Sequence, residues 1–146
     1  MVGAQCARAP GQPSGAVLGA LGDEQAVAEV LEKENGIAAD VWSVTSWSEL
    51  RRDGAAAEEA TIFGGKPTVS YAAKCLGSTD GTIIAASDYV KAVPELIRAY
   101  LPGGRRYVTL GTDGFGRSDT RAALREHFKV DAQAIVKAAA AAIRIA

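Results

Sequence analysis

The sequence predicts an α/β fold: a three-layer α/β sandwich built on a mostly parallel, mixed sheet. Short apolar runs alternate along the chain with stretches whose apolar residues recur at helical spacing, which is the pattern of strand and crossover-helix units. The last apolar run, residues 107–110, leads through a glycine-rich loop into a helix that begins at Ser118-Asp119-Thr120. This order is typical of the carboxyl edge of a parallel sheet. With 146 residues, of which 48% are hydrophobic, the chain can form one domain with a full core.

Two strands and one helix are predicted in the first third of the chain. Residues 1–15 contain several glycines and prolines, so we expect a flexible or loosely docked leader there, followed by one domain over residues 16–146. Residues 16–21 form the first expected strand. Asp23 is expected to cap a helix that stops at Asn35-Gly36, and residues 37–45 form the second strand.

The middle of the chain begins with a helix-capping signal. Ser46 is followed three residues later by Glu49, which is the spacing of a capping box. We expect this helix to be short and to end at Asp53-Gly54, with residues 55–67 as a surface connection. A helical turn over residues 70–76 and a turn at residues 79–81 then lead into a strand, residues 82–86, that is apolar enough to be buried on both faces.

The last third predicts one more strand and three helices. Ser87-Asp88 is expected to cap a helix that reaches Tyr100, with Pro94 kinking or restarting it. The strand at residues 107–110 and the helix after Ser118-Asp119-Thr120 follow. An alanine-rich helix from Asp131 closes the chain.

Composition excludes several classes of function. Sixteen basic and seventeen acidic residues give a net charge of −1 without a basic patch, so no nucleic-acid partner is expected. Two distant cysteines and one histidine cannot form a disulfide framework or a zinc site, and a reduced cytoplasmic compartment is expected. The sequence contains no signal-peptide pattern and no apolar run long enough to span a membrane, so no membrane partner is expected.

Few residues offer catalytic chemistry. The single imidazole, His127, falls late in a helix, where a structural role is expected, and Cys75 is expected to be an ordinary half-buried thiol. The adjacent carboxylate pairs Asp23-Glu24 and Glu58-Glu59 point in different directions and cannot flank one bond. The two tryptophans, at positions 42 and 47, are expected in the core.

The loop over residues 111–117 is the strongest candidate site. Its glycine order, G-x-x-G-x-G, matches neither the dinucleotide fingerprint nor the phosphate loop. The following helix N-terminus, with Arg117 beside it, could hold a carboxylate or phosphate. Alternatively, Phe115 packs into a neighbouring surface and Arg117 pairs with Asp113 or Asp119, and this structural interpretation is favoured. The candidate docking or anion loop consists of Asp113, Gly114, Phe115, Gly116, Arg117 and Ser118.

Four blocks of the sequence carry a family resemblance. They are residues 110–121 (LGTDGFGRSDTR), residues 39–46 (ADVWSVTS) with Glu49-Leu50 and Asp53-Gly54 after them, residues 85–89 (AASDY), and residues 128–132 (FKVDA) with Ile135-Val136. In this order and spacing they resemble the C-terminal region of the homodimeric bacterial pyruvate dehydrogenase decarboxylating component. The resemblance covers about residues 36–143. It departs at residues 55–67, at a strand and helix over residues 16–34 that are about one helical turn short, and before residue 14, where nothing matches.

The resemblance implies a transketolase C-terminal-like domain, the third domain of a thiamine-diphosphate enzyme. In that family thiamine diphosphate, its magnesium and the catalytic residues belong to the first two domains, so no cofactor, metal or catalytic residue is expected in this chain. The implied partners are the remaining domains of the parent enzyme, a second copy of the chain in a homodimer, and the dihydrolipoyl acetyltransferase of the complex. We expect a non-catalytic, dimer-supporting domain that exposes an apolar interface when separated. The alternative is a stand-alone anion- or metabolite-binding module that uses residues 111–120.

Overall fold

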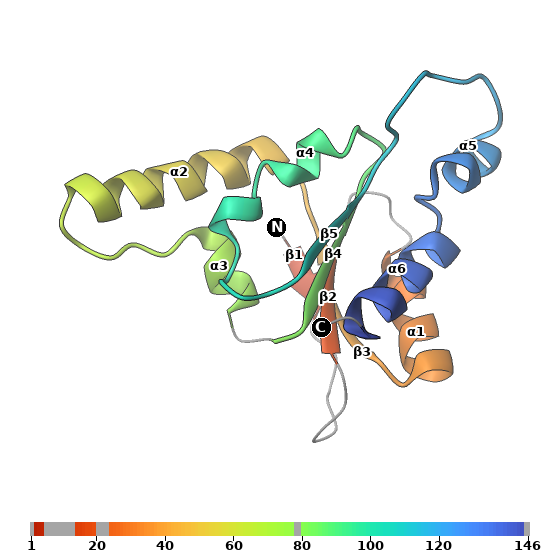
Figure 1. Cartoon of the computed structure of the whole chain (residues 1–146), viewed down its shortest axis with the longest axis horizontal. Coiled ribbons are helices and arrows are strands. Elements are labelled where there is room, and N and C mark those ends of the chain that lie inside the picture. Colours follow the sequence, from red (N-terminus) through yellow and green to blue (C-terminus); the bar gives the residue numbers. More distant parts are fainter. Residues whose placement is uncertain (1, 5–13, 20–23, 78–79, 145–146) are drawn as a thin grey trace.

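The protein is described by a computed structural model that places residues 2–4, 14–19, 24–77 and 80–144 (Figure 1). Its strands form one sheet in the order β1-β3-β2-β4-β5. Their bounds are Val2–Ala4 (β1), Ser14–Gly19 (β2), Ala38–Ser43 (β3), Thr82–Ala86 (β4) and Tyr107–Leu110 (β5). Strands β2 to β5 pair in parallel, and β1 lies antiparallel to β3 at the edge. The predicted mostly parallel, mixed sheet is therefore confirmed.

Helices cover both faces of this sheet. Their bounds are Glu24–Asn35 (α1), Trp47–Phe63 (α2), Tyr71–Leu76 (α3), Ala92–Glu95 (α4), Arg98–Tyr100 (η1, a 3₁₀ turn), Arg121–Phe128 (α5) and Ala132–Arg144 (α6). Figure 1 shows α1 and α6 on one side of the sheet and α2, α3 and α4 on the other. This is the three-layer sandwich that the sequence predicts.

Strand β4 joins the two halves of the core. All five of its residues are buried, because it lies between β2 and β5 with helices over both faces. Ile84 packs with the α1 and α6 side chains, whereas Ile83 packs with the cluster under α2 and α3. Trp42 and Trp47 belong to this second cluster, which confirms their predicted place in the core.

The N-terminal part of the fold differs from the expected leader. Residues 2–4 form β1, and β2 begins at Ser14, two residues before the predicted start of the first strand. Residues 5–13 and 20–23, which include the expected cap Asp23, lie outside the described residues. Helix α1 ends as predicted before Gly36, which adopts the left-handed φ of 64° that favours glycine.

Helix α2 is longer than the sequence pattern indicates. Ser46 caps it as predicted, its side chain accepting a 3.3 Å hydrogen bond from the Glu49 N–H. The Glu49 carboxylate pairs with Arg52 instead of returning to the cap. The predicted stop at Gly54 is wrong, as is the surface connection over residues 55–67, because the helix continues to Phe63. Gly54 is buried inside it against the Tyr100 ring, and the alanine-rich segment that follows favours helix.

The helix predicted after Ser87-Asp88 is also corrected. Only a four-residue helix, α4, and the turn η1 form there. The Ser87 hydroxyl accepts a 3.1 Å hydrogen bond from the N–H of Tyr89, and the Asp88 carboxylate faces arginines of α5, so neither side chain caps a helix. The structure confirms the other predicted elements, α3, β4, β5, α5 and α6, with Ser70 and Thr120 as side-chain caps.

A polar network holds α4 and η1 on the edge strand β5. The Arg98 guanidinium donates to both Glu95 carboxylate oxygens, at 2.5 and 2.7 Å, and Thr109 donates to Glu95 at 2.6 Å. The Tyr107 hydroxyl donates to the Pro94 carbonyl at 2.7 Å. Hydrogen bonds from Arg98 lower the pKa of Glu95, whereas burial raises the pKa of Tyr107.

Candidate functional site

Two loops meet at the carboxyl edge of the sheet. The segment after β4 and the loop after β5 lie side by side because β4 and β5 are parallel neighbours. Thr112 joins them twice: its N–H donates to the Tyr89 carbonyl at 2.9 Å, and its hydroxyl donates to the Asp88 carbonyl at 2.8 Å. Asp113 adds a third link, accepting from the Lys91 N–H at 2.8 Å, with its carboxylate 3.6 Å from the Lys91 ammonium.

Gly111 permits this close approach. It is buried, and a Cβ at this position would lie 2.6 Å from the Tyr89 carbonyl oxygen and 2.7 Å from the Lys91 nitrogen. Both neighbours are backbone atoms, which cannot move aside without displacing the segment after β4. The first glycine of the loop is therefore needed for packing between the two loops.

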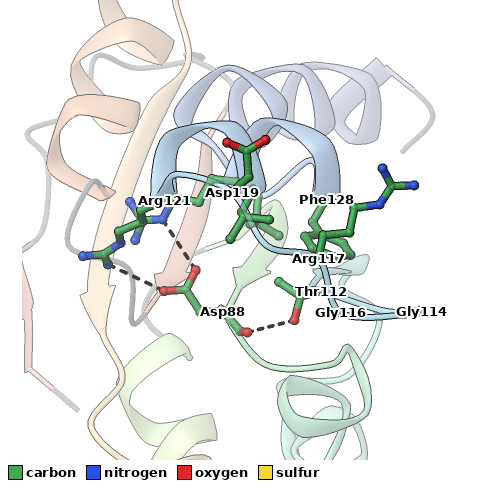
Figure 2. A pocket seen from close by; sticks show the side chains of 11 residues that line it. Asp88, Thr112, Gly114, Gly116, Arg117, Asp119, Arg121 and Phe128 are labelled. Atoms are coloured by element: carbon green, nitrogen blue, oxygen red, sulfur yellow. Dashed lines mark hydrogen bonds and ion pairs between the residues drawn. The ribbon is translucent and has the colours of Figure 1, made fainter.

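A cleft of about 500 Å³ opens between the loop after β5 and helix α5 (Figure 2). Its apolar wall is formed by Leu124, Phe128 and Val130. The remaining lining residues are loop glycines and polar or charged side chains: Asp88, Thr112, Gly114, Gly116, Arg117, Asp119, Arg121 and Arg125. The cleft thus combines an apolar wall with three guanidinium groups and two carboxylates.

Most of this charge is already compensated within the chain. The Asp88 carboxylate lies 3.6 Å from the Arg121 guanidinium and 3.5 Å from that of Arg125 (Figure 2). Asp119 accepts a 2.7 Å hydrogen bond from the N–H of Thr120, the residue before α5. Among the described residues Arg117 has no hydrogen-bond or ion-pair partner, and Figure 2 shows its guanidinium pointing away from Asp88 and Asp119.

The structure brings the predicted loop residues together but changes their partners. Asp113 pairs with Lys91, so the expected pairing of Arg117 with Asp113 or Asp119 is wrong. The Phe115 ring is 96% exposed, so it does not pack into a neighbouring surface of this chain. Gly114 has a φ of 102°, whereas Gly116 does not adopt a positive φ. Ser118 is exposed and leaves the capping position to Thr120.

Sequence reasoning missed the contribution of Asp88 and of α5. Arg121 and Arg125 lie four residues apart in α5, a spacing that places both side chains on the same face of the helix. Asp88 follows the buried strand β4 closely, so parallel pairing brings it to the same edge. These two signals together would have predicted the arginine and carboxylate cluster.

The other candidate residues lie apart from the cleft. His127 is exposed, with its ring 4.9 Å from that of Phe128 in an edge-to-face arrangement, and Cys75 is partly buried beside α2. A hydrogen bond with Cys75 raises the pKa of the exposed Tyr71 hydroxyl. Glu58 and Glu59 are exposed on α2. No cluster of three or more metal-ligating side chains occurs among the described residues, and none of the described helices is long and apolar enough to cross a membrane.

Comparison with known proteins gives consistent relatives. Residues 14–131 match the family described as the transketolase-like TK C-terminal domain. The pyruvate dehydrogenase E1 component of Pseudomonas aeruginosa is 47% identical over 125 residues, which are 84% of this chain and 14% of the relative. The E1 component of Mycobacterium tuberculosis is 51% identical over 113 residues, 76% of this chain and 12% of the relative, and that of Escherichia coli is 46% identical over 114 residues, 77% of this chain and 12% of the relative.

A solved structure shares the fold. It is described as a split-gene transketolase in the form of an inactive β4 tetramer, and it superimposes with a TM-score of 0.60 at 20% identity, covering 98% of this chain and 42% of the other. This likeness confirms the transketolase C-terminal-like architecture. In all these comparisons, the chain corresponds to a minor part of a longer relative.

Proposed function

The chain belongs to the family of transketolase-like C-terminal domains, and from this premise we propose that it acts as the C-terminal structural domain of a thiamine-diphosphate-dependent pyruvate dehydrogenase. In such an enzyme, which oxidatively decarboxylates pyruvate and transfers the acetyl group, this domain packs against the remaining domains and supports the dimer. The observation that carries the proposal is 46–51% identity to pyruvate dehydrogenase E1 components of which the chain spans only 12–14%.

We propose no catalytic residue in this chain. A general base must reach the proton that it abstracts and is usually oriented by another group, but the exposed His127 has no hydrogen-bond or ion-pair partner among the described residues. The described residues also do not fit the magnesium and diphosphate of the cofactor, because they lack a metal-ligating cluster and the loop lacks a phosphate-binding glycine pattern. We therefore assign cofactor binding to the other domains of the enzyme.

The proposed partners follow from this assignment. They are the remaining domains of the enzyme, a second copy in the homodimer and the dihydrolipoyl acetyltransferase of the complex, all in the cytoplasm. Exposed apolar side chains at two separate places support contact with other protein surfaces. They are Ile62 and Phe63 at the end of α2, and Tyr89 and Phe115 at the carboxyl edge of the sheet.

A chimera tests the proposal. Residues 14–144 replace the corresponding C-terminal region of the Escherichia coli E1 component, and a variant that stops before this region serves as the control. We expect the chimera to decarboxylate pyruvate with thiamine diphosphate and magnesium, and the shortened variant to lose most of its activity and its dimer. A shortened variant as active and as dimeric as the intact enzyme would contradict a supporting role. Decarboxylation by the present chain alone would contradict its non-catalytic assignment.

A second candidate function rests on the unpaired Arg117 at the rim of the cleft. A guanidinium that lacks a partner among the described residues, beside a cavity of about 500 Å³, favours an anion- or metabolite-binding module. Calorimetric titration with phosphate, pyruvate and thiamine diphosphate tests it. Saturable heat that disappears in Arg117→Ala supports this candidate, and no saturable heat at millimolar ligand removes it.

A further inference from the structure

Apolar side chains gather at the carboxyl edge of the sheet. We name the segments 88–90 and 113–119 together the carboxyl-edge surface. Within it the rings of Phe115 and Tyr89 are 96% and 66% exposed, and Val90 is also exposed. Large aromatic side chains and arginines are enriched at protein interfaces, where a few such residues supply most of the binding energy. The composition of this surface therefore favours contact with a protein.

The exposed Phe115 belongs to a loop that is held in place. Thr112 and Asp113 bond the start of the loop to the segment after β4, and Gly111 packs directly on that segment. At its other end the loop enters α5, where the Thr120 hydroxyl accepts a hydrogen bond from the Ala123 N–H. A loop fixed at both ends loses little conformational freedom when its exposed ring is bound, which favours association.

The same surface also offers a place for such a ring. The cleft beside the loop has Leu124, Phe128 and Val130 on its apolar wall. Its volume of about 500 Å³ lies within the roughly 300–1,000 Å³ of pockets that bury small ligands, so an aromatic side chain fits. One ring and one apolar-walled cleft therefore lie next to each other on every copy of the chain.

Two opposite charges on the carboxyl-edge surface could also pair between two copies of the chain. Arg117 lacks an internal partner among the described residues, and the Asp119 carboxylate is exposed two residues away, where it accepts a bond from the Thr120 N–H. Both side chains line the cleft. The guanidinium and the carboxylate lie close together in one loop, so each can face the opposite charge on a second copy. A two-fold interface requires this self-complementarity, because the same patch occurs on both sides.

We propose that two copies of this chain associate through the carboxyl-edge surface, with Phe115 of each copy in the cleft of the other and Arg117 of each opposite Asp119 of the other. This inference rests on the dimer-supporting role proposed above and specifies its contact. The end of α2 does not offer the same match. Ile62, Phe63 and Val69 are exposed there, but Figure 1 shows the end of α2 reaching away from the sheet, on the side opposite α5.

Sedimentation equilibrium of the chain over a range from low to high micromolar concentration tests the interface. We expect a reversible dimer whose dissociation constant rises at least tenfold in Phe115→Ala. Phe63→Ala is the matched control, since this phenylalanine is 83% exposed but lies at the end of α2, and it should leave the constant unchanged. A monomeric wild-type chain, an unaffected Phe115→Ala, or a dimer lost only in Phe63→Ala would each overturn the proposal.

A charge exchange gives a second, independent test. Arg117→Asp and Asp119→Arg should each weaken the dimer because like charges then face each other, and the double variant should restore it because the pair reforms across the two-fold axis. A double variant no tighter than either single one would overturn the proposed pairing. Both side chains are exposed, so we expect each variant to keep the fold, and circular dichroism checks this.

The chimera separates this inference from the proposed function. A chimera with Phe115→Ala that keeps pyruvate decarboxylation, together with an isolated chain whose dimer is insensitive to Phe115→Ala, would remove the interface and leave the supporting role standing. Conversely, an isolated chain that dimerises through Phe115, in combination with a shortened relative that is fully active and dimeric, would confirm the interface and remove the supporting role.

Discussion

The Tyr100 ring lies directly against the backbone of Gly54, in the space that a Cβ at Gly54 would occupy. This contact joins η1 to the middle of α2, and the hydroxyl of Ser70, the cap of α3, donates a 2.8 Å hydrogen bond to the Tyr100 carbonyl. Tyr100 therefore links three helical segments on one face of the sheet. Glycine inside a helix costs about 0.5–1 kcal/mol relative to alanine, so this close approach explains a residue that helix propensity disfavours.

Substitution of Gly54 by alanine should destabilise the protein. In an exposed helix the change stabilises, but here the added methyl group overlaps the Tyr100 ring and forces α2 and η1 apart. Overpacking of this kind typically costs about 1–3 kcal/mol. Urea denaturation measures the change in the free energy of unfolding. Gly103→Ala is the control, because no atom lies within 4 Å of the position of its Cβ; equal stability of the two variants would contradict the packing role of Gly54.

Arg105 should stabilise the turn before β4. Its guanidinium donates to three carbonyl oxygens, those of Gly81 at 2.6 Å, Leu76 at 2.8 Å and Asp80 at 3.2 Å. Arg105→Ala removes these bonds, and we expect a loss of about 1–3 kcal/mol in the free energy of unfolding. Arg105→Lys should recover only part, because a compact ammonium cannot span three acceptors as a planar guanidinium does. The neighbouring Arg106 is exposed, and its replacement by alanine should cost less; the reverse order would contradict the assignment.

The fold was largely predictable because local signals and tertiary packing agree. Ser46, Ser70 and Thr120 cap helices through their own hydroxyl groups, and strands β2 to β5 coincide with apolar runs in the sequence. Gly36 ends α1 by a local left-handed turn. Signals of this kind act over a few residues and need no knowledge of distant partners.

The predictions from sequence were wrong where contacts between residues far apart in the chain determine the local structure. The sequence indicates a helix stop at Gly54, but Tyr100, 46 positions later, packs on it and the helix continues. It indicates a cap at Asp88, but Arg121 and Arg125 of α5 face that carboxylate. Asp113 likewise pairs with Lys91 of the segment after β4 and not with Arg117. These partners lie on different elements, so their proximity follows from the sheet order and not from sequence spacing.

The network around Glu95 should make stability depend on acidic pH. Hydrogen bonds from Arg98, and a further one from Thr109, lower the pKa of this carboxyl from its ordinary value of 4.5, although burial acts in the opposite direction. The folded-state pKa is below the unfolded one, so the stabilisation is present above about pH 4.5 and disappears as the pH falls through the folded-state pKa. Since the pair is partly exposed, its contribution should stay below about 1 kcal/mol.

Glu95→Gln checks this dependence. The difference in free energy of unfolding between the wild type and this variant should be largest near neutral pH and should shrink as the pH falls below 4.5. Glu58→Gln is the control, because Glu58 is exposed on α2 and has no partner among the described residues. A difference that stays constant from pH 7 to pH 3 would contradict a role for the ionised Glu95.

The two glycines at the tip of the loop provide the final prediction. Gly114 has a φ of 102°, which β-branched residues rarely adopt, whereas Gly116 has no positive φ, and at both positions the space that a Cβ would occupy is open, with no atom within 4 Å. Gly114→Val should therefore cost about 1 kcal/mol or more through backbone strain alone, and Gly116→Val should cost clearly less. Thermal unfolding of both variants measures the contrast. Because Phe115 lies between the two glycines, strain at Gly114 should also displace its ring, so Gly114→Val should weaken association of two copies more than Gly116→Val. Equal melting temperatures and equal dissociation constants for the two variants would show that the left-handed turn at Gly114 does not position Phe115.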